Sequence, residues 1–286
     1  MAGEVRGVTQ SACLPDTGDG DVWVRVTRPI NPADASFGRV VDDMIVLVDG
    51  TPFAEWRENG ERVRVDDARL LAPVIPPVLY ACGINYTGHA RAISAEFNRS
   101  LESLIPKKPE IGYRAQSAII AVGEKIVIPA DALSEVQCEG ELAVVIGRPA
   151  KKVRASDALN YVFGYSICND VSMRDWQFAD RTFWRSKNSD TFKPLGPCIA
   201  TNRDVADMTS RVCLNGEVME EFATGNMLYD VADYIEAISQ YITLHPGDVI
   251  MMGTDGHSPR IAHGDTIEIA IDGVGRLINP VVRETA

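Results

Sequence analysis

The segment Cys138-Glu139-Gly140-Glu141-Leu142-Ala143-Val144-Val145-Ile146-Gly147 decides the fold class and places the chemistry. Residues 142–146 are a continuous apolar run, which is typical of a buried β-strand. Because alternate residues of a strand point to the same side, Glu139 and Glu141 are expected to face one direction, about 7 Å apart along the backbone. Like charges at this spacing repel unless they are solvated, protonated or bridged by a cation. The pair therefore marks either a solvated strand entry or part of a cation site.

A second apolar run delivers a third carboxylate. Residues 161–168 (YVFGYSIC) predict another strand, and Asn169 and Asp170 follow it. Three carboxylates at strand ends suit a hard divalent ion such as Mg²⁺ or Mn²⁺, which would keep about three of its six positions for water and substrate. The sequence contains no HExxH, Gly-x-Ser-x-Gly, P-loop or Gly-x-Gly-x-x-Gly motif, so zinc-protease, serine-hydrolase and nucleotide-binding functions lose their usual support.

Composition limits the possible partners. The chain has 286 residues, of which 45% are hydrophobic and 24% charged, so it can bury an ordinary core. It carries 28 Lys and Arg against 40 Asp and Glu, and this net charge of −12 disfavours a nucleic-acid partner. No stretch approaches the roughly 20 apolar residues of a membrane helix, and residues 1–10 lack the apolar run of a signal peptide. We therefore expect a cytoplasmic protein with a small-molecule substrate and no membrane partner.

The cysteines are scattered, with no Cys-x-x-Cys pair and no zinc-like spacing with histidine. An intracellular protein of this size rarely needs disulfides, so they are expected to be reduced and mostly buried. A reactive thiol is the alternative, but no histidine sits near any of them in sequence. The six residues are Cys13, Cys82, Cys138, Cys168, Cys198 and Cys213.

The chain is expected to have two β-rich parts. Residues 22–26 alternate as a strand does, and an apolar run over 44–48 ends at Asp49-Gly50, a pair that is typical of hairpin turns. Three prolines then punctuate the chain, namely Pro73, Pro76 and Pro77. We therefore predict a small N-terminal β-rich domain over residues 1–75 and a larger domain over 76–286.

The larger part is predicted to be mostly antiparallel β-structure with few helices. Asn215-Gly216 and Asp272-Gly273 each separate two strand-like runs and predict hairpins. Apolar residues recur at three- and four-residue steps in 227–242, which predicts a helix with Asn226 as its N-cap. A second helix is predicted over 88–104. The fold class is therefore α+β and mainly β.

An ordered set of segments between residues 78 and 282 resembles the signature of the fumarylacetoacetate hydrolase superfamily. The segments are 139–147, 164–177, 194–197, 244–250 with 253–254, and 273–277. The resemblance implies a mixed β-roll or sandwich as the C-terminal catalytic domain, with the activity of a metal-dependent acylpyruvate or diketo-acid hydrolase. It also implies that Glu139, Glu141 and Asp170 hold Mg²⁺ or Mn²⁺.

The resemblance further implies a set of substrate-contacting residues. Arg174 and Gln177, which follow Asp170 by four and seven residues, would contact substrate oxygens. Lys187 would help to neutralise a metal-bound oxyanion, and Thr254 would cap a substrate carboxylate or oxyanion. Taken by themselves, the arginine and the lysine are more often solvated or engaged in surface ion pairs.

His89 is the candidate general base. Residues 83–89 (GINYTGH) resemble the family's Asn-Tyr-x-x-His segment, in which a lid helix carries this histidine. A lone histidine is more often structural, and only the flanking segment favours a catalytic role. Many members place a glutamate three residues later to orient the ring, but this chain has Ala92 there. Glu96 lies seven residues after the histidine, roughly 10 Å along a helix axis, which is too far for a hydrogen bond.

Two further departures bear on the substrate. Arg114 stands where the family's decarboxylases and acylpyruvate hydrolases commonly have lysine, and it would present a fixed fork to a substrate carboxylate. The usual Gly-Thr-Pro is Gly253-Thr254-Asp255 in this chain. Asp255 and the nearby His257 are expected to be ordinary loop residues.

The implied activity is hydrolytic cleavage of a carbon–carbon bond in a β-diketo acid through a metal-chelated enolate, with His89 activating water. One alternative is a metal-dependent lyase, decarboxylase, isomerase or hydratase acting on a 2-oxo acid of the oxaloacetate or 2-hydroxyhepta-2,4-diene-1,7-dioate type, which Ala92 keeps open. The other is a non-catalytic metal- or ligand-binding domain, against which Lys187, Arg174 and Gln177 argue. Members of the family generally pair through the large domain, so a homodimer is expected.

Overall fold

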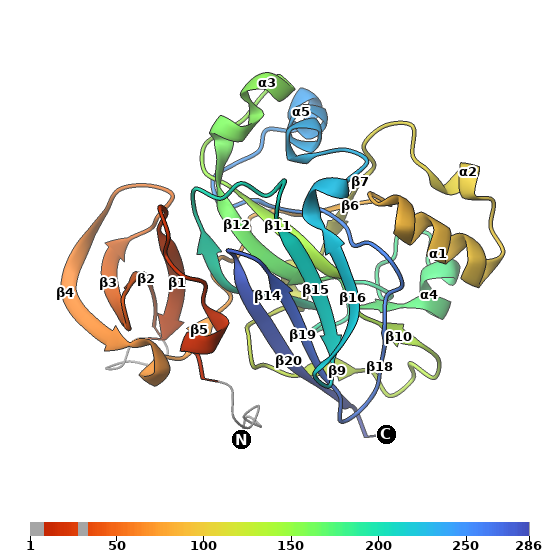
Figure 1. The fold of residues 1–286 in the computed structure, drawn as a ribbon, viewed down its shortest axis with the longest axis horizontal. Helices are drawn as coiled ribbons and strands as arrows, with labels where there is room; N and C mark the ends of the chain where they lie inside the picture. The colour runs from red at the N-terminus through yellow and green to blue at the C-terminus, as the bar shows by residue number, and fades with distance from the viewer. Residues whose placement is uncertain (1–8, 28–33, 286) are drawn as a thin grey trace.

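The computed structural model describes residues 9–27 and 34–285 (Figure 1). The first eight residues, which are part of the segment that lacks a signal-peptide pattern, lie outside this range. The described residues form mainly strands with a few helices, so the prediction of a mainly β, α+β fold is confirmed. Within them, no helix is both long and apolar enough to cross a membrane.

The largest sheet runs through both parts of the chain in the order β4-β3-β2-β1-β14-β12-β11-β17-β6-β7, with β5 paired to β1 and β8 to β14. Its strands are β1 (Val22–Thr27), β2 (Ala35–Val41), β3 (Met44–Gly50), β4 (Trp56–Arg64), β5 (Leu70–Leu71), β6 (Leu79–Cys82), β7 (Ile111–Arg114), β8 (Ile119–Ile120), β11 (Gly140–Ile146), β12 (Val162–Asn169), β14 (Lys193–Ala200) and β17 (Val249–Met251). In Figure 1, β1–β5 form a lobe at one side of the molecule. β1 nevertheless pairs antiparallel with β14, with Val22 opposite Ala200. The domain division at residue 75 stays a prediction.

A five-stranded sheet packs against this large sheet, since β20 contacts β12 and β14, and β15 contacts β11. Its strands are β9 (Ile126–Ile128), β15 (Thr209–Leu214), β16 (Glu217–Ala223), β19 (Thr266–Ile271) and β20 (Gly275–Arg283). Ile267, Ile269 and Ile271 of β19 are buried while the residues between them are half-exposed, which is the alternation of a strand with one face in the core. A small sheet completes the β-structure, with β10 (Val136–Gln137), β13 (Ser172–Met173) and β18 (Arg260–Ile261).

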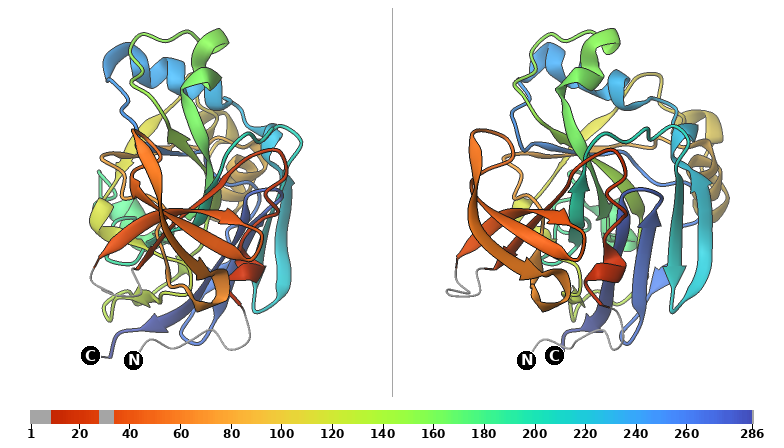
Figure 2. Two further views of the ribbon diagram at one scale, coloured as in Figure 1. Left: turned by 90° about the vertical axis from the view of Figure 1, so that its left-hand side faces the viewer. Right: turned by 60° about the vertical axis from the view of Figure 1, so that its left-hand side comes forward.

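The α-helices of the described residues are α1 (Thr87–Phe97), α2 (Leu101–Leu104), α3 (Ala155–Ala158), α4 (Arg174–Ala179) and α5 (Val231–Tyr241). Both views in Figure 2 place α3 beside α5 at one end of the molecule, in agreement with their contacts. The predicted start of the helix in 227–242 is wrong. Asp230, not Asn226, is the N-cap, because the carboxylate of Asp230 accepts from the backbone of Asp233 while the carboxylate of Asp233 accepts from that of Asp230.

The predicted helix over 88–104 is two helices. Asn98 has a φ of 49°, a left-handed conformation that ends α1. The backbone N–H of Arg99 donates to the Ser94 carbonyl at 3.2 Å, and the Ser94 hydroxyl donates to the Arg99 carbonyl at 2.7 Å. The chain then turns before α2 starts at Leu101, so the sequence periodicity continued past a real break.

Two of the three predicted hairpin turns are found where the sequence places them. Asn215 and Gly216, with φ values of 54° and 86°, join β15 to β16, and Asp272-Gly273 lies in the turn between β19 and β20. Asp49-Gly50 differs, because both residues belong to β3 and Gly50 pairs with Trp56. The turn is therefore longer and lies between Gly50 and Trp56.

The core contains most of the cysteines, as predicted. Five of the six are buried and Cys213 is half-buried, and all six are free thiols. Burial raises the pKa of Cys13 to about 11, which favours the neutral thiol.

Candidate active site

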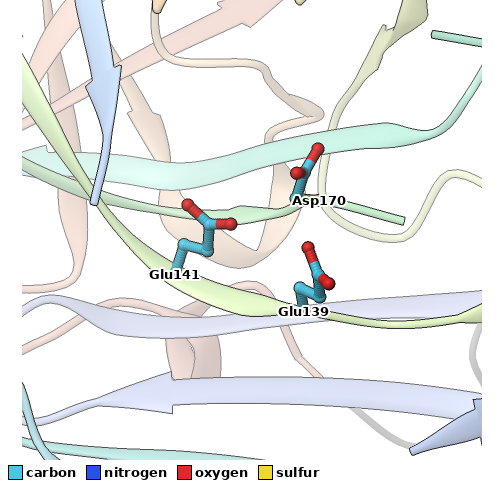
Figure 3. Close-up of side chains that lie close together, drawn as sticks. All are labelled: Glu139, Glu141 and Asp170. Atoms are coloured by element: carbon cyan, nitrogen blue, oxygen red, sulfur yellow. The ribbon is translucent and has the colours of Figure 1, made fainter. Parts of the chain in front are cut away.

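Three carboxylates meet where the first residue of β11 pairs with the last residue of β12. Gly140 of β11 is opposite Asn169 of β12, and the backbone N–H of Asp170 donates to the Glu139 carbonyl at 2.9 Å. Carboxylate oxygens of Glu139, Glu141 and Asp170 lie within 4.8 Å of one another (Figure 3), and the three residues are 4%, 3% and 1% exposed. The expected convergence of the three groups is therefore found, and they are buried rather than solvated.

Gly140 explains how the two glutamates come to share one direction. A Cβ at this position would lie 2.7 Å from Val212 Cγ2 and 3.0 Å from Ile269 Cγ2. The five-stranded sheet thus presses against β11 on the face between the two glutamates. Because side chains alternate along a strand, Glu139 and Glu141 project to the opposite face.

Asp170 is held by three cations. Arg114 forms a two-point contact, with Nε 2.8 Å from Oδ1 and Nη2 2.7 Å from Oδ2. Lys187 Nζ donates to Oδ2 at 2.6 Å, and Lys193 Nζ lies 2.9 Å from Oδ1. Burial opposes ionisation of Asp170, but Arg114 and the two lysines outweigh it and hold the pKa of this carboxyl well below its usual range. The fork of Arg114, which we expected to face a substrate carboxylate, is therefore engaged by Asp170.

Glu139 is also paired with two cations. Arg174 Nη2 donates to Oε1 at 2.6 Å, and Lys187 Nζ donates to Oε2 at 2.7 Å. Burial opposes ionisation, but Lys187 and Arg174 outweigh it and lower the pKa of Glu139 to about 2. Arg174 Nη1 also donates to Gln177 Oε1 at 2.8 Å, so Gln177 is positioned at the same cluster.

Glu141 differs from the other two carboxylates. Its Oε2 accepts from the backbone N–H of Gly253 at 2.7 Å, and no ion pair of Glu141 is found within the described ranges 9–27 and 34–285. Burial, together with Asp170 and Glu139, raises the pKa of Glu141 to about 8. A buried carboxyl beside two other carboxylates and without its own cation fits a divalent ion that prefers oxygen ligands. The donor set therefore fits Mg²⁺ or Mn²⁺, with Glu139, Glu141 and Asp170 as the residues that would hold it.

His89 lies beside the carboxylates on α1. Its Nδ1 is 3.0 Å from the carbonyl oxygen of Gly256, and its Nε2 is 3.7 Å from Glu139 Oε1. A carbonyl oxygen can only accept, so Nδ1 carries the hydrogen and Nε2 carries the free lone pair. Burial lowers the pKa of His89, although Glu139 opposes this shift, so the ring is neutral at neutral pH.

The carbonyl of Gly256, rather than a side chain of α1, orients the ring. Ala92 is buried and offers no polar group. Glu96 accepts from Gln137 Nε2 at 3.2 Å and pairs with Arg260, in keeping with the expectation that it does not reach His89.

Asp255, which was expected to be an ordinary loop residue, contacts the backbone of His89. Its Oδ1 accepts from the backbone N–H of His89 and from that of Gly256, both at 2.9 Å. It therefore ties the first turn of α1 to the loop that holds the ring of His89. A Cβ at Gly88 would lie 2.3 Å from Asp255 Oδ1, so a glycine is required there. His257, by contrast, is exposed, as expected of a loop residue.

Lys193 was also missed. It is 0% exposed, and burial lowers its pKa to about 8, although Asp170 opposes the shift. A lysine directly before Pro194, at the start of the apolar stretch 194–200, was the available sequence signal.

All the site residues predicted from the sequence line one cavity of about 550 Å³. They are His89, Arg114, Glu139, Glu141, Asp170, Arg174, Gln177, Lys187 and Thr254. Apolar side chains also line this cavity, together with the charged Arg99, Glu110, Asp180 and Arg181; the apolar residues are Ile84, Ile93, Leu104, Ile111, Phe178 and Phe183. Phe97 of α1 contacts Phe178 of α4 edge-to-face, with ring centroids 4.7 Å apart. The individual roles of these residues stay predictions.

Comparison with known proteins gives matches along most of the chain. Residues 79–282 match the family model described as fumarylacetoacetate (FAA) hydrolase C-terminal, and residues 23–73 match the model Rv2993c-like, N-terminal. Protein Rv2993c of Mycobacterium tuberculosis is 40% identical over 236 residues, which cover 82% of this chain and 86% of that protein. The mitochondrial oxaloacetate tautomerase FAHD2A of Bos taurus is 36% identical over 229 residues, which cover 76% of this chain and 70% of that protein.

A solved structure agrees with the fold. The crystal structure of 5-carboxymethyl-2-hydroxymuconate delta-isomerase from Mycobacterium smegmatis has a TM-score of 0.82 and 37% identity, and covers 92% of this chain and 100% of that one. The likeness read from the signature segments is therefore confirmed at the level of the family. The chain belongs to the fumarylacetoacetate hydrolase family.

Proposed function

We propose that this protein is a divalent-metal-dependent enzyme that moves a proton at the carbon next to the carbonyl of a 2-oxo acid, as in keto–enol isomerisation. The observation that carries the proposal is the position of His89, which lines the same cavity as the three carboxylates. Its Nδ1 is held by the Gly256 carbonyl, and its Nε2, which has the free lone pair, lies 3.7 Å from Glu139 Oε1. This arrangement supplies one neutral base next to a cation site. It is sufficient for proton transfer to and from carbon.

The proposed reaction divides the work among the residues of the cavity. A Mg²⁺ or Mn²⁺ ion held by Glu139, Glu141 and Asp170 would act as a Lewis acid and as a template for substrate oxygens. His89 would take the proton at Nε2 from the carbon next to the substrate carbonyl and deliver it to the carbonyl oxygen, so that one C–H bond is broken and one O–H bond is formed, while its Nδ1–H stays bonded to the Gly256 carbonyl. Lys187 would stabilise the negative charge that develops on the substrate oxygen.

Arg174, Gln177 and Thr254 are proposed to bind the substrate. All three line the cavity, and Arg174 already positions Gln177 through its Nη1 contact. Their side chains offer donors to a substrate carboxylate or carbonyl.

We also propose that the chain pairs as a homodimer through its larger part. Sedimentation analysis tests whether the protein is a dimer in solution.

Two findings favour isomerisation over hydrolysis as the first candidate. Hydrolysis requires an activated water in addition to the base, and the position from which the family resemblance implies a glutamate that orients His89 is Ala92 in this chain. The relatives described above include proteins named as a tautomerase and an isomerase. Hydrolysis, which the sequence alone favoured, becomes the second candidate.

Carbon–carbon hydrolysis of a β-diketo acid is supported by the apolar residues in the lining of the cavity. These residues, which include Ile93, Leu104 and Phe178, would accommodate an acyl chain that a compact acid such as oxaloacetate lacks. In this reaction His89 would take its proton from water rather than from carbon.

The test separates the two reactions and a non-catalytic role. The Mg²⁺-loaded protein is given oxaloacetate in D₂O, and then an acylpyruvate in ¹⁸O-water. Catalysed exchange of the C3 hydrogens without ¹⁸O in a new carboxylate supports isomerisation, whereas ¹⁸O incorporation with cleavage supports hydrolysis. Binding of oxalate without turnover of either substrate would contradict an enzymatic role.

A further inference from the structure

Lys193 is a buried charged residue that the proposed reaction does not use. It is the first residue of β14 and is 0% exposed. Its Nζ lies 2.9 Å from Asp170 Oδ1 and donates to the main-chain carbonyls of Phe192 at 2.7 Å and Val171 at 3.1 Å. Unlike Lys187, it does not line the cavity. A substrate would therefore not reach it, and any influence on the chemistry must act through Asp170.

Lys193 is not required to orient Asp170. The two-point contact of Arg114, at 2.8 Å and 2.7 Å, already fixes the plane of this carboxylate. What Lys193 adds is a positive charge beside a carboxylate that would share its negative charge with a metal ion. Removing that charge should leave the geometry of Asp170 intact while changing its electrostatics.

We propose that Lys193 is a positioning residue that acts through Asp170 by its charge and limits how strongly Asp170 holds the divalent ion. More of the ion's positive charge is then available to an anionic chelator. The inference rests on the proposed function, since it assumes an ion bound by the three carboxylates. The positive charges of Lys193 and of the divalent ion repel each other strongly in a buried site, because little water screens them. A carboxylate that partly neutralises Lys193 offers less negative charge to the ion, which then attracts a bound anion more strongly.

This role makes a prediction that a purely structural role does not. Loss of the Lys193 charge should tighten binding of the metal ion and weaken binding of an anionic ligand to the loaded site. A residue that only supports the local fold would, when replaced, disturb the site and weaken both. The direction of the two changes therefore separates the two roles.

The test uses two neutral variants, Lys193→Met and Lys193→Gln, and a matched control, Lys151→Met. Lys151 is exposed, and its Nζ donates to the Tyr241 carbonyl at 2.8 Å, so the control removes the same charge away from the cavity. Titration calorimetry at pH 7 measures Mn²⁺ binding to the metal-free proteins and oxalate binding to the Mn²⁺-saturated proteins. We expect the Lys193 variants to bind Mn²⁺ about tenfold more tightly and oxalate about tenfold more weakly. The control should match the wild type in both.

Unchanged or weaker Mn²⁺ binding in a folded Lys193 variant overturns the inference. Lys193→Gln retains an N–H donor for the carbonyls of Val171 and Phe192, so it guards against simple loss of structure. If thermal unfolding shows that neither neutral variant folds, Lys193 is a structural residue and the inference is overturned as well. Failure of the wild type to bind Mn²⁺ would instead overturn the proposed function. If the wild type binds Mn²⁺ and the Lys193 variants bind it with the same affinity, only the role of Lys193 is refuted.

Discussion

The Nδ1 atom of His89 lies 3.0 Å from the carbonyl oxygen of Gly256, which fixes the tautomer that leaves Nε2 free to accept a proton. Replacing His89 by alanine should therefore lower turnover by about 10²- to 10⁴-fold, the range of a lost general base. Mn²⁺ binding should persist, because the three carboxylates are unchanged. Steady-state rates and calorimetry check the two parts, and the substitution His257→Ala, at an exposed position, is the matched control. Full activity in His89→Ala would remove this residue from the proposed role.

Asp255 is expected to act on catalysis through the position of His89. The substitution Asp255→Ala removes the acceptor for the backbone N–H groups of His89 and Gly256 and should destabilise the protein by about 1 kcal/mol, as loss of a helix cap does. Turnover should fall while Mn²⁺ affinity stays close to that of the wild type. Urea unfolding and kinetics measure these effects. An unchanged rate in a destabilised protein would show that Asp255 supports only the fold.

The raised pKa of Glu141 predicts that the metal-free protein loses stability as pH rises. The pKa of this carboxyl is about 8 in the folded protein, against an ordinary value of 4.5. Its contribution is therefore fully present below about pH 4.5 and is lost as pH rises through about 8, where the buried carboxyl must ionise. Thermal unfolding in EDTA across this range should show a falling Tm for the wild type and a flatter profile for Glu141→Gln. Parallel profiles for the two proteins would contradict the assignment.

Gly140 is predicted to be required by the packing of two sheets rather than by the chemistry. A Cβ there would lie 2.7 Å from Val212 Cγ2, so Gly140→Ala should cost about 1–3 kcal/mol through overpacking. The free energy of unfolding in urea measures the loss. Val218→Ala in β16, where the side chain is 57% exposed, should change it little. Equal stability of Gly140→Ala and the wild type would show that the sheets separate without cost.

Local patterns in the sequence carried much of the fold and the main groups of the site. The apolar run of 142–146 and the Asn215-Gly216 turn act through neighbouring residues, so both could be predicted. The convergence of Glu139, Glu141 and Asp170 followed from strand periodicity together with the family resemblance. The predicted helix boundaries near Asn98 and Asp230 were wrong, because caps and left-handed residues, not apolar spacing, set where a helix begins and ends.

Contacts between distant segments could not be read from the sequence. Asp255 accepts a hydrogen bond from the backbone of His89, which is 166 residues away in the sequence. Arg114 donates to Asp170, which is 56 residues away. Lys193 meets Asp170 only because β14 lies beside β12 in the sheet. Aspartate, arginine and lysine usually lie on the protein surface. Only the three-dimensional fold shows that Asp255, Arg114 and Lys193 instead contact residues of the site.

Mn²⁺ binding directly measures whether Glu139, Glu141 and Asp170 together form a cation site. Calorimetry and electron paramagnetic resonance on the metal-free protein should give one Mn²⁺ per chain, and Glu141→Gln and Asp170→Asn should each weaken binding by at least about tenfold. Addition of oxalate should change the Mn²⁺ spectrum of the wild type, because a chelator takes ligand positions that the protein leaves free. Absence of stoichiometric binding, or binding that survives both substitutions, would show that these three carboxylates do not form the metal site.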